Sequence, residues 1–219
     1  MRMVVKLKRP IVDLGAPGAN IGLFTLQLLL ALPAPAVIVA AEPLPQNVAL
    51  LRRNLALHAD AVAASGCDVR VLPLAVGDSS GSTTITYFPH MPGNSTALPG
   101  EKAQLQATQM PAARFADQQP CSCRVISISD LIGQENLRRV GLLKVDVEGM
   151  ELAVLQGIAL SDWPCISQVV VEVHDIVEGG SRRLAQALAL LQSQNFECRV
   201  VPTAPAGNVL VYAMQRTCS

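Results

Sequence analysis

Residues 142–155, LLKVDVEGMELAVL, change their pattern halfway along. Apolar residues first alternate with Lys144, Asp146 and Glu148, and a helical spacing of apolar residues begins after the glycine. Because side chains alternate between the two faces of a strand, the three ionisable groups share one face. Charged groups are costly to bury, so we expect this face to border a polar cleft.

The rest of the chain repeats this alternation of strand and helix. The sequence predicts strands at residues 9–15, 36–43, 67–78, 82–90, 141–148, 167–175, 196–201 and 208–214. It predicts helices at residues 19–32, 45–59, 149–158 and 181–194. This order indicates an α/β fold with a doubly wound sheet, formed by a single domain over residues 1–219. Residues 84–123 are rich in Pro, Gly, Ala and Gln, and we interpret them as a lid-like insertion.

The composition argues against several classes of partner. The chain has 17 basic and 17 acidic residues, and its aromatic residues are four Phe, two Tyr and one Trp. A neutral chain with few aromatic side chains offers neither the charge nor the stacking surfaces that nucleic acids bind. Six cysteines without a CxxC spacing are typical of a reduced protein, so we expect a cytoplasmic location.

The N-terminal region allows an alternative interpretation. Basic residues at positions 2–9 precede an uncharged run at residues 21–41, as in a signal sequence or a membrane span. Pro33 and Pro35 break this run in its middle. The run therefore fits a helix, a loop and a strand better, and we expect no membrane partner.

The turn between the first strand and the first helix is rich in glycine: residues 13–22 read DLGAPGANIG. Its Gly15, Gly18 and Gly22 let the backbone approach a ligand, and the helix N-terminus offers N–H groups to an anion. The spacing does not match the GxGxxG of dinucleotide sites, which disfavours a dehydrogenase. Glu42 ends the next strand, where an acid can accept hydrogen bonds from ribose hydroxyls. This order favours a nucleoside site; the alternative is a tight turn with Glu42 as a helix-capping acid.

Polar residues also end two later strands. Glu172 and His174 alternate with valines, as Asp146 and Glu148 do. If the two strands are neighbours, these groups converge, shift one another's pKa values and become candidates for acid–base catalysis. The alternative is a structural ion pair, for example between Lys144 and Glu172.

A divalent cation could find oxygen ligands in the same region, in Asp146, Glu172 and Asp175. Alternating acids at strand ends more often serve acid–base or hydrogen-bonding roles. The sequence therefore predicts no metal site.

Six segments carry a family resemblance. They are VDLGAPGANIGLFTL (12–26), VAAEPLPQNVALLRRNLALH (39–58), LPLAVGDSSG (72–81), YFPHMPGNST (87–96), LLKVDVEGMELAVLQG (142–157) and VVVEVHD (169–175). Together they resemble the FkbM-type methyltransferases over residues 11–214, most specifically at KVDVEGME, residues 144–151. The resemblance implies a Rossmann-like class I methyltransferase fold, with a mostly parallel seven-stranded sheet, helices on both faces and only the last strand reversed.

The resemblance also implies S-adenosylmethionine as the methyl donor and a hydroxyl of a small molecule, sugar or polyketide-type intermediate as the acceptor. By motif position, the donor would be surrounded by Asp13, Gly15, Gly18, Asn20 and Gly22, with Glu42 at its ribose and Ala75 and Val76 at its adenine. We predict His174 or Asp146 as the base, with Glu148 and Glu172 orienting the base or the acceptor. Tyr87, Asn94 and Ser95 belong to the segment expected to fold over the acceptor.

Two departures from the family pattern favour a second interpretation. The segment GAPGAN carries three extra residues, and its Pro17 removes a backbone donor. The chain also begins close to its first strand, whereas relatives usually carry N-terminal helices that cover the donor, so we expect a shortened or partner-completed form. The alternative function is a catalytically impaired remnant that binds the donor and acts as an interaction module.

Overall fold

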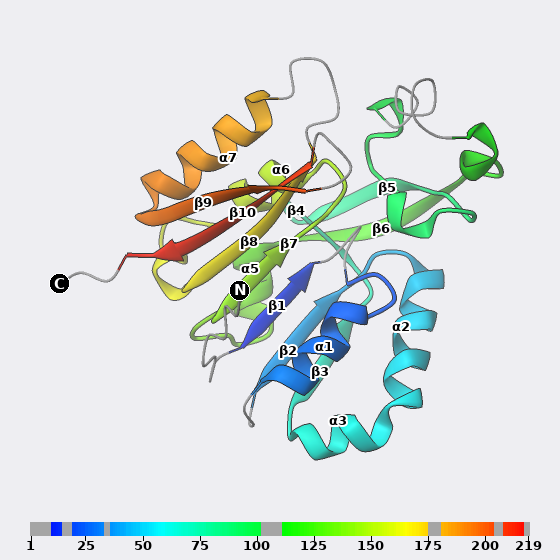
Figure 1. The fold of residues 1–219 in the computed structure, drawn as a ribbon, viewed down its shortest axis with the longest axis horizontal. Coiled ribbons are helices and arrows are strands. Elements are labelled where there is room, and N and C mark those ends of the chain that lie inside the picture. Colours follow the sequence, from blue (N-terminus) through cyan, green and yellow to red (C-terminus); the bar gives the residue numbers. More distant parts are fainter. Residues whose placement is uncertain are drawn as a thin grey trace.

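The computed structural model describes residues 10–14, 19–32, 36–101, 111–174, 181–203 and 208–216. Within these residues the main sheet has seven strands in the order β3-β2-β1-β7-β8-β10-β9 (Figure 1). They are β1 (Ile11–Leu14), β2 (Val37–Ala41), β3 (Asp68–Leu72), β7 (Leu142–Val145), β8 (Gln168–His174), β9 (Phe196–Pro202) and β10 (Asn208–Gln215). Strand β10 is antiparallel to both of its neighbours, and the other pairs in the sheet are parallel. The predicted mostly parallel sheet with a reversed last strand is confirmed.

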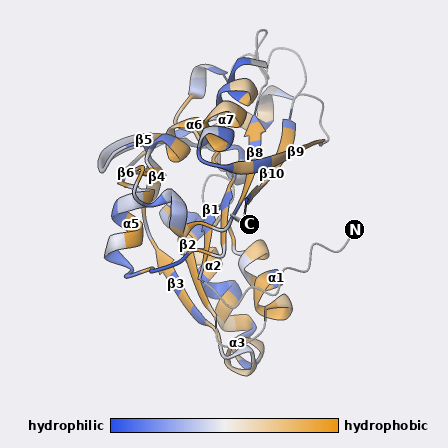
Figure 2. Ribbon diagram, turned by 90° about the vertical axis from the view of Figure 1, so that its left-hand side faces the viewer, coloured by the Kyte–Doolittle hydropathy of each residue, from blue (hydrophilic) through white to orange (hydrophobic). Residues whose placement is uncertain are grey.

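Helices cover both faces of this sheet. On one face, Ile11 and Ile38 pack against Leu28 and Leu29 of α1 (Leu23–Ala31). The next residues along the strands, including Val12, belong to a larger cluster with α5 (Ile128–Gln134), α6 (Glu151–Gln156) and α7 (Ser181–Ser193). Figure 2 shows α1 and α5 on opposite sides of the sheet. Strands buried on both faces need continuous apolar runs, which explains sequences such as VIVAA in β2.

The second helical region continues further than its pattern predicts. Helix α2 (Pro45–Leu57) has proline in its first turn, where the missing N–H has no intrahelical partner to lose. A separate helix, α3 (Ala59–Ser65), follows directly and ends at Gly66, which adopts a left-handed conformation with φ of 63°. Among the described residues, no helix combines the length and apolar character needed to cross a membrane.

A second sheet of three strands adjoins the main one. It has the order β4-β6-β5, with β4 (Ala75–Gly77), β5 (Gly81–Tyr87) and β6 (Gln119–Ser127). The single strand predicted at residues 67–78 is wrong, because the chain turns at Pro73 and passes from β3 in the main sheet to β4 in the small sheet. The proposed insertion at residues 84–123 therefore has paired strand residues at both ends, for example Ile85 opposite Cys121. Between them lie the 3-10 turns η1 (Pro92–Asn94) and η2 (Ala112–Phe115).

Candidate active site

The carboxyl ends of four adjacent parallel strands form the polar edge of the main sheet. Strand β1 lies where the strand order reverses, with β2 on one side and β7 and β8 on the other. In open α/β sheets this crevice is where ligands bind. Asp13, Glu42, Asp146 and His174 stand at the ends of these four strands. Four of the predicted site residues are therefore brought to one edge.

The described part of the glycine-rich turn is built around Asp13 and Gly22. Asp13 is buried and accepts a hydrogen bond from Thr25 Oγ1 at 2.8 Å. Gly22 precedes α1 with φ of 85°, and a Cβ added there would lie 3.1 Å from Leu51 Cγ. Both conditions favour glycine at this position. Gly15 and Gly18, which are also predicted to surround the methyl donor, lie outside the described residues.

Glu42 joins this turn to the start of α2. One of its carboxylate oxygens accepts the backbone N–H of Asn20 at 2.8 Å, and the other accepts Leu44 N at 3.0 Å and Asn47 Nδ2 at 3.2 Å. Burial raises the pKa of Glu42 to about 7, against the opposing effect of these donors and with a smaller contribution from the charge of Asp13. Glu42 thus contacts the residue before α2 and the side chain of Asn47, rather than a backbone N–H in the first turn of the helix, and a ribose would have to exchange with these donors.

A cavity of about 220 Å³ lies between the small sheet and the turn that follows β7. Ala75 and Val76, the residues predicted to face adenine, line one wall, and Val147 and Met150 line another. Pockets that enclose a whole drug-sized ligand are usually about 300–1,000 Å³, so this cavity fits part of a ligand, such as a base.

The residues predicted to contact the acceptor are mostly engaged in local packing. Tyr87 is buried in a cluster with Leu44 and Ile85. The hydroxyl of Ser95 is buried and accepts the backbone N–H of Phe88 at 3.2 Å. Asn94 ends the 3-10 turn η1. The described contacts of Tyr87 and Ser95 are therefore local, and the role of the three residues at the acceptor stays a prediction.

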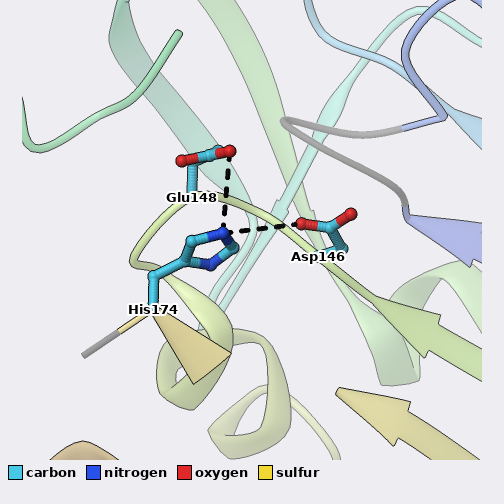
Figure 3. A group of neighbouring side chains, drawn as sticks. All are labelled: Asp146, Glu148 and His174. Atoms are coloured by element: carbon cyan, nitrogen blue, oxygen red, sulfur yellow. Dashed lines mark ion pairs between the residues drawn. The ribbon is translucent and has the colours of Figure 1, made fainter. Parts of the chain in front are cut away.

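Asp146, Glu148 and His174 form a group of three ionisable side chains at this edge (Figure 3). His174 Nε2 lies 3.9 Å from Asp146 Oδ1 and 3.6 Å from Glu148 Oε1. The alternating strand pattern predicted that the two acids share a face, but β7 ends at Val145. The chain then turns through Glu148 and Gly149, with φ of 51° and 106°. This turn, rather than strand alternation, brings both carboxylates to the imidazole.

Glu151 completes the group and was missing from the predicted catalytic set. Its Oε1 accepts the backbone N–H of Gly149 at 2.9 Å and lies 2.8 Å from His174 Nδ1. It is 1% exposed. The signal that could have found it is the acid in the first helical turn after the glycine of the KVDVEGME segment.

The carboxylates around His174 control its charge. Burial acts to lower its pKa, but the hydrogen bond to Glu151 and the charges of Glu151, Glu148 and Asp146 outweigh it and raise the pKa to about 9. The imidazole of this cluster is therefore positively charged at neutral pH.

Lys144 and Glu172 do not form the ion pair considered from the sequence. Lys144 Nζ lies 3.2 Å from Asp146 Oδ2 and 5.2 Å from the ring centroid of Phe24. Glu172 instead accepts a hydrogen bond from Asn208 Nδ2 at 3.3 Å, across the antiparallel pair of β8 and β10. Glu172 therefore lies outside the His174 cluster.

The strand order, the reversed β10 and the acid-ended strands define a class I methyltransferase fold. A solved structure of methyltransferase FkbM from Methylobacillus flagellatus aligns with a TM-score of 0.58 and 16% identity, over 93% of this chain and 43% of that chain. The family model for the methyltransferase FkbM domain matches residues 18–198, and the chain belongs to this family.

Two curated relatives are also similar to the chain. Methyltransferase sdnD of Sordaria araneosa is 37% identical over 195 residues, covering 82% of this chain and 71% of the relative. The 31-O-demethyl-FK506 methyltransferase FkbM of Streptomyces tacrolimicus is 34% identical over 195 residues, covering 82% and 70%. These matches favour a methyltransferase over the alternative of an interaction module.

Proposed function

We propose that this chain transfers the methyl group of S-adenosylmethionine to a hydroxyl oxygen of a small molecule, such as a sugar or a polyketide-type intermediate. The observation that carries the proposal is the grouping of Asp146, Glu148 and His174 beside a nucleoside-type strand edge with Asp13 and Glu42. The name of the Streptomyces relative, which refers to an oxygen of FK506, supports oxygen as the acceptor atom.

The residues at the ends of β1 and β2 fit the donor. Glu42 follows the last residue of β2, and an acid at this strand end can accept hydrogen bonds from ribose hydroxyls. The cavity lined by Ala75 and Val76 has room for a base but not for the whole donor. The donor would supply an activated methyl group on a sulfonium. The chain's own contribution is to align the two reactants and to exclude water.

The residues at the ends of β7 and β8 fit the acceptor. A hydroxyl oxygen is a weak nucleophile until its proton is accepted by a neighbouring group. The side chain of Asp146 is 15% exposed, whereas those of Glu148 and His174 are 9% and 6% exposed, so an incoming hydroxyl meets Asp146 first. We therefore assign Asp146 as the base that accepts the proton of the acceptor hydroxyl. His174 is a positioning residue that sets the direction of the two carboxylates.

Two measurements test the proposal. Calorimetry with S-adenosylmethionine should show binding to the wild-type chain, and absence of binding by the folded protein would remove the proposal. Release of S-adenosylhomocysteine should then be followed with a panel of monosaccharides and hydroxylated polyketides. Asp146→Asn should keep donor binding and lose most of kcat, whereas His174→Ala should change both kcat and KM.

A matched control removes a carboxylate far from this edge. Asp68 begins β3 and pairs with Arg70 at 2.8 Å on the exposed surface. Asp68→Asn should turn over like the wild type. Undiminished turnover by both Asp146→Asn and His174→Ala would contradict the assigned roles.

A further inference from the structure

We propose that Asp146, Glu148 and His174 bind one small divalent cation of the Mg²⁺ or Mn²⁺ type. This rests on the proposed function, in which the same cluster receives the acceptor hydroxyl. One ligand atom from each residue lies within 4.8 Å of the others. The two carboxylate oxygens suit such a cation, whereas a soft metal prefers thiolates.

The two distances from His174 Nε2 to the carboxylates are compatible with the size of such an ion. Nitrogen and oxygen ligands lie about 2.0–2.2 Å from a small divalent metal, so two ligands on one ion are about 3 Å apart when adjacent and about 4 Å apart when opposite. The 3.9 Å and 3.6 Å from His174 Nε2 to Asp146 Oδ1 and Glu148 Oε1 fall between these limits. Both are longer than an ordinary hydrogen bond of about 2.7–3.2 Å.

The second observation is the way His174 is held. Its side chain is 6% exposed, and Nε2 is aimed between the two carboxylates (Figure 3). Nδ1 donates to Glu151 Oε1 at 2.8 Å, and Gly149 N fixes the same oxygen at 2.9 Å. A buried carboxylate on the far nitrogen is the arrangement that orients metal-binding histidines and fixes the tautomer that leaves Nε2 free for a metal. A simple ion pair between His174 Nε2 and the two acids would not need the carboxylate of Glu151 on Nδ1.

Within the part of the chain that the structure describes, the side chains that face the cluster carry a net charge of about two negative units when the imidazole is neutral. Asp146, Glu148 and Glu151 contribute three carboxylates, and Lys144 contributes one cation, bonded to Asp146. From α7, Arg183 reaches the backbone oxygen of His174 at 3.3 Å, but its charge is balanced by Glu101. A divalent cation bound to a neutral imidazole therefore balances the group, taking the place of the imidazolium proton.

Such an ion would extend the role of the cluster in the proposed reaction. Asp146 is the most exposed of the three ligands, so the ion would be reached from its side. A hydroxyl bound to a divalent cation loses its proton more readily than a free hydroxyl. The ion would thus hold the acceptor oxygen next to Asp146 and favour its deprotonation.

The test uses Mn²⁺ alone, without donor or acceptor. Chelator-treated, dialysed protein should bind one Mn²⁺ per chain, seen by calorimetry and by loss of the free-ion electron paramagnetic resonance signal. His174→Ala and Asp146→Asn should each abolish this site. Glu151→Gln, which keeps all three ligands, should weaken Mn²⁺ binding about 10–100-fold. Glu172→Gln on the same strand should bind Mn²⁺ like the wild type. Circular dichroism confirms that each variant is folded.

The outcomes separate this proposal from the proposed function. Folded wild-type protein that binds no Mn²⁺, or Mn²⁺ binding that persists in both His174→Ala and Asp146→Asn, overturns the cation site. Methyl transfer that is unaffected by excess chelator overturns the catalytic role of the ion and leaves the proposed function intact. One Mn²⁺ site together with no binding of S-adenosylmethionine supports the cation site and contradicts the proposed function.

Discussion

Thr96 Oγ1 donates a 2.8 Å hydrogen bond to the backbone oxygen of Glu148. Both residues are buried, and the same hydroxyl accepts the backbone N–H of Leu98 at 3.0 Å. One side chain therefore connects the segment after β5 to the turn that carries two of the three ligands of the His174 cluster. The position of Glu148 depends on a residue 52 positions away in the sequence.

Thr96→Val should destabilise the fold and disturb the cluster. Valine has the same shape but leaves the Glu148 carbonyl and the Leu98 N–H without this partner, which costs about 1–3 kcal/mol for a buried group. Urea unfolding gives the change in free energy, and S-adenosylhomocysteine release gives the change in turnover. Thr84→Val, at an exposed position in β5, is the control and should change stability by less than about 0.5 kcal/mol. Equal stability of the two variants would contradict the role of the Thr96 bond.

Gly157→Ala should be one of the most damaging single substitutions. A Cβ at Gly157 would lie 2.2 Å from the backbone oxygen of Gly77, so α6 and β4 would have to separate. At Gly133 in α5, a Cβ meets no atom within 4 Å, and alanine in a helix is favoured by up to about 1 kcal/mol. Thermal unfolding should show a lower Tm for Gly157→Ala and an equal or higher Tm for Gly133→Ala. Similar Tm values for the two variants would show that the contact between α6 and β4 is not tight.

Glu42 should make the folded state less stable as the pH rises from 4.5 to 7. Its pKa is raised from 4.5 to about 7, so the folded chain keeps a proton that the unfolded chain has lost over this range. The stabilisation is complete below pH 4.5 and is lost through about pH 7, with a total of up to about 3 kcal/mol. Glu42→Gln cannot titrate and should flatten this part of the profile. Urea unfolding at a series of pH values measures how the free energy of unfolding depends on pH. The same slope in Glu42→Gln as in the wild type would contradict the raised pKa of Glu42.

The same group should make donor binding depend on pH. If Glu42 accepts ribose hydroxyls, the ionised form binds them better than the neutral form, because charged acceptors make stronger hydrogen bonds. The affinity for S-adenosylmethionine should therefore rise as the pH passes through about 7. Glu42→Ala should lose most of the affinity at every pH. Calorimetry that finds full affinity in Glu42→Ala would exclude Glu42 from the donor site.

The central sheet could be predicted from the sequence because inner strands such as β1 and β2 are buried on both faces and have largely continuous apolar sequences. The small sheet could not, since β5 pairs with β6 across a long intervening segment and local pattern carries no signal for such pairing. The division of β3 from β4 was missed for a related reason: both halves are apolar, and Pro73 alone marks the change of sheet.

The candidate site was predicted in part. The strand ends were sufficient to select Asp146, Glu148 and His174. Glu151 was not selected because an acid in the first turn of a helix is usually explained by its favourable interaction with the helix dipole. Glu172 fits the same alternating pattern as His174, and only the strand order shows that it faces Asn208 of β10.

The passage of the chain from β3 to β4 has a consequence for how the cavity is built. Only Pro73 and Leu74 separate the two strands, and Gly77 at the end of β4 is pressed against Gly157 of the neighbouring helix end. The wall formed by Ala75 and Val76 is therefore held at both of its ends. Val147 and Met150 line the opposite side, so this wall of the cavity and the carboxylates of Asp146 and Glu148 belong to one turn of the chain.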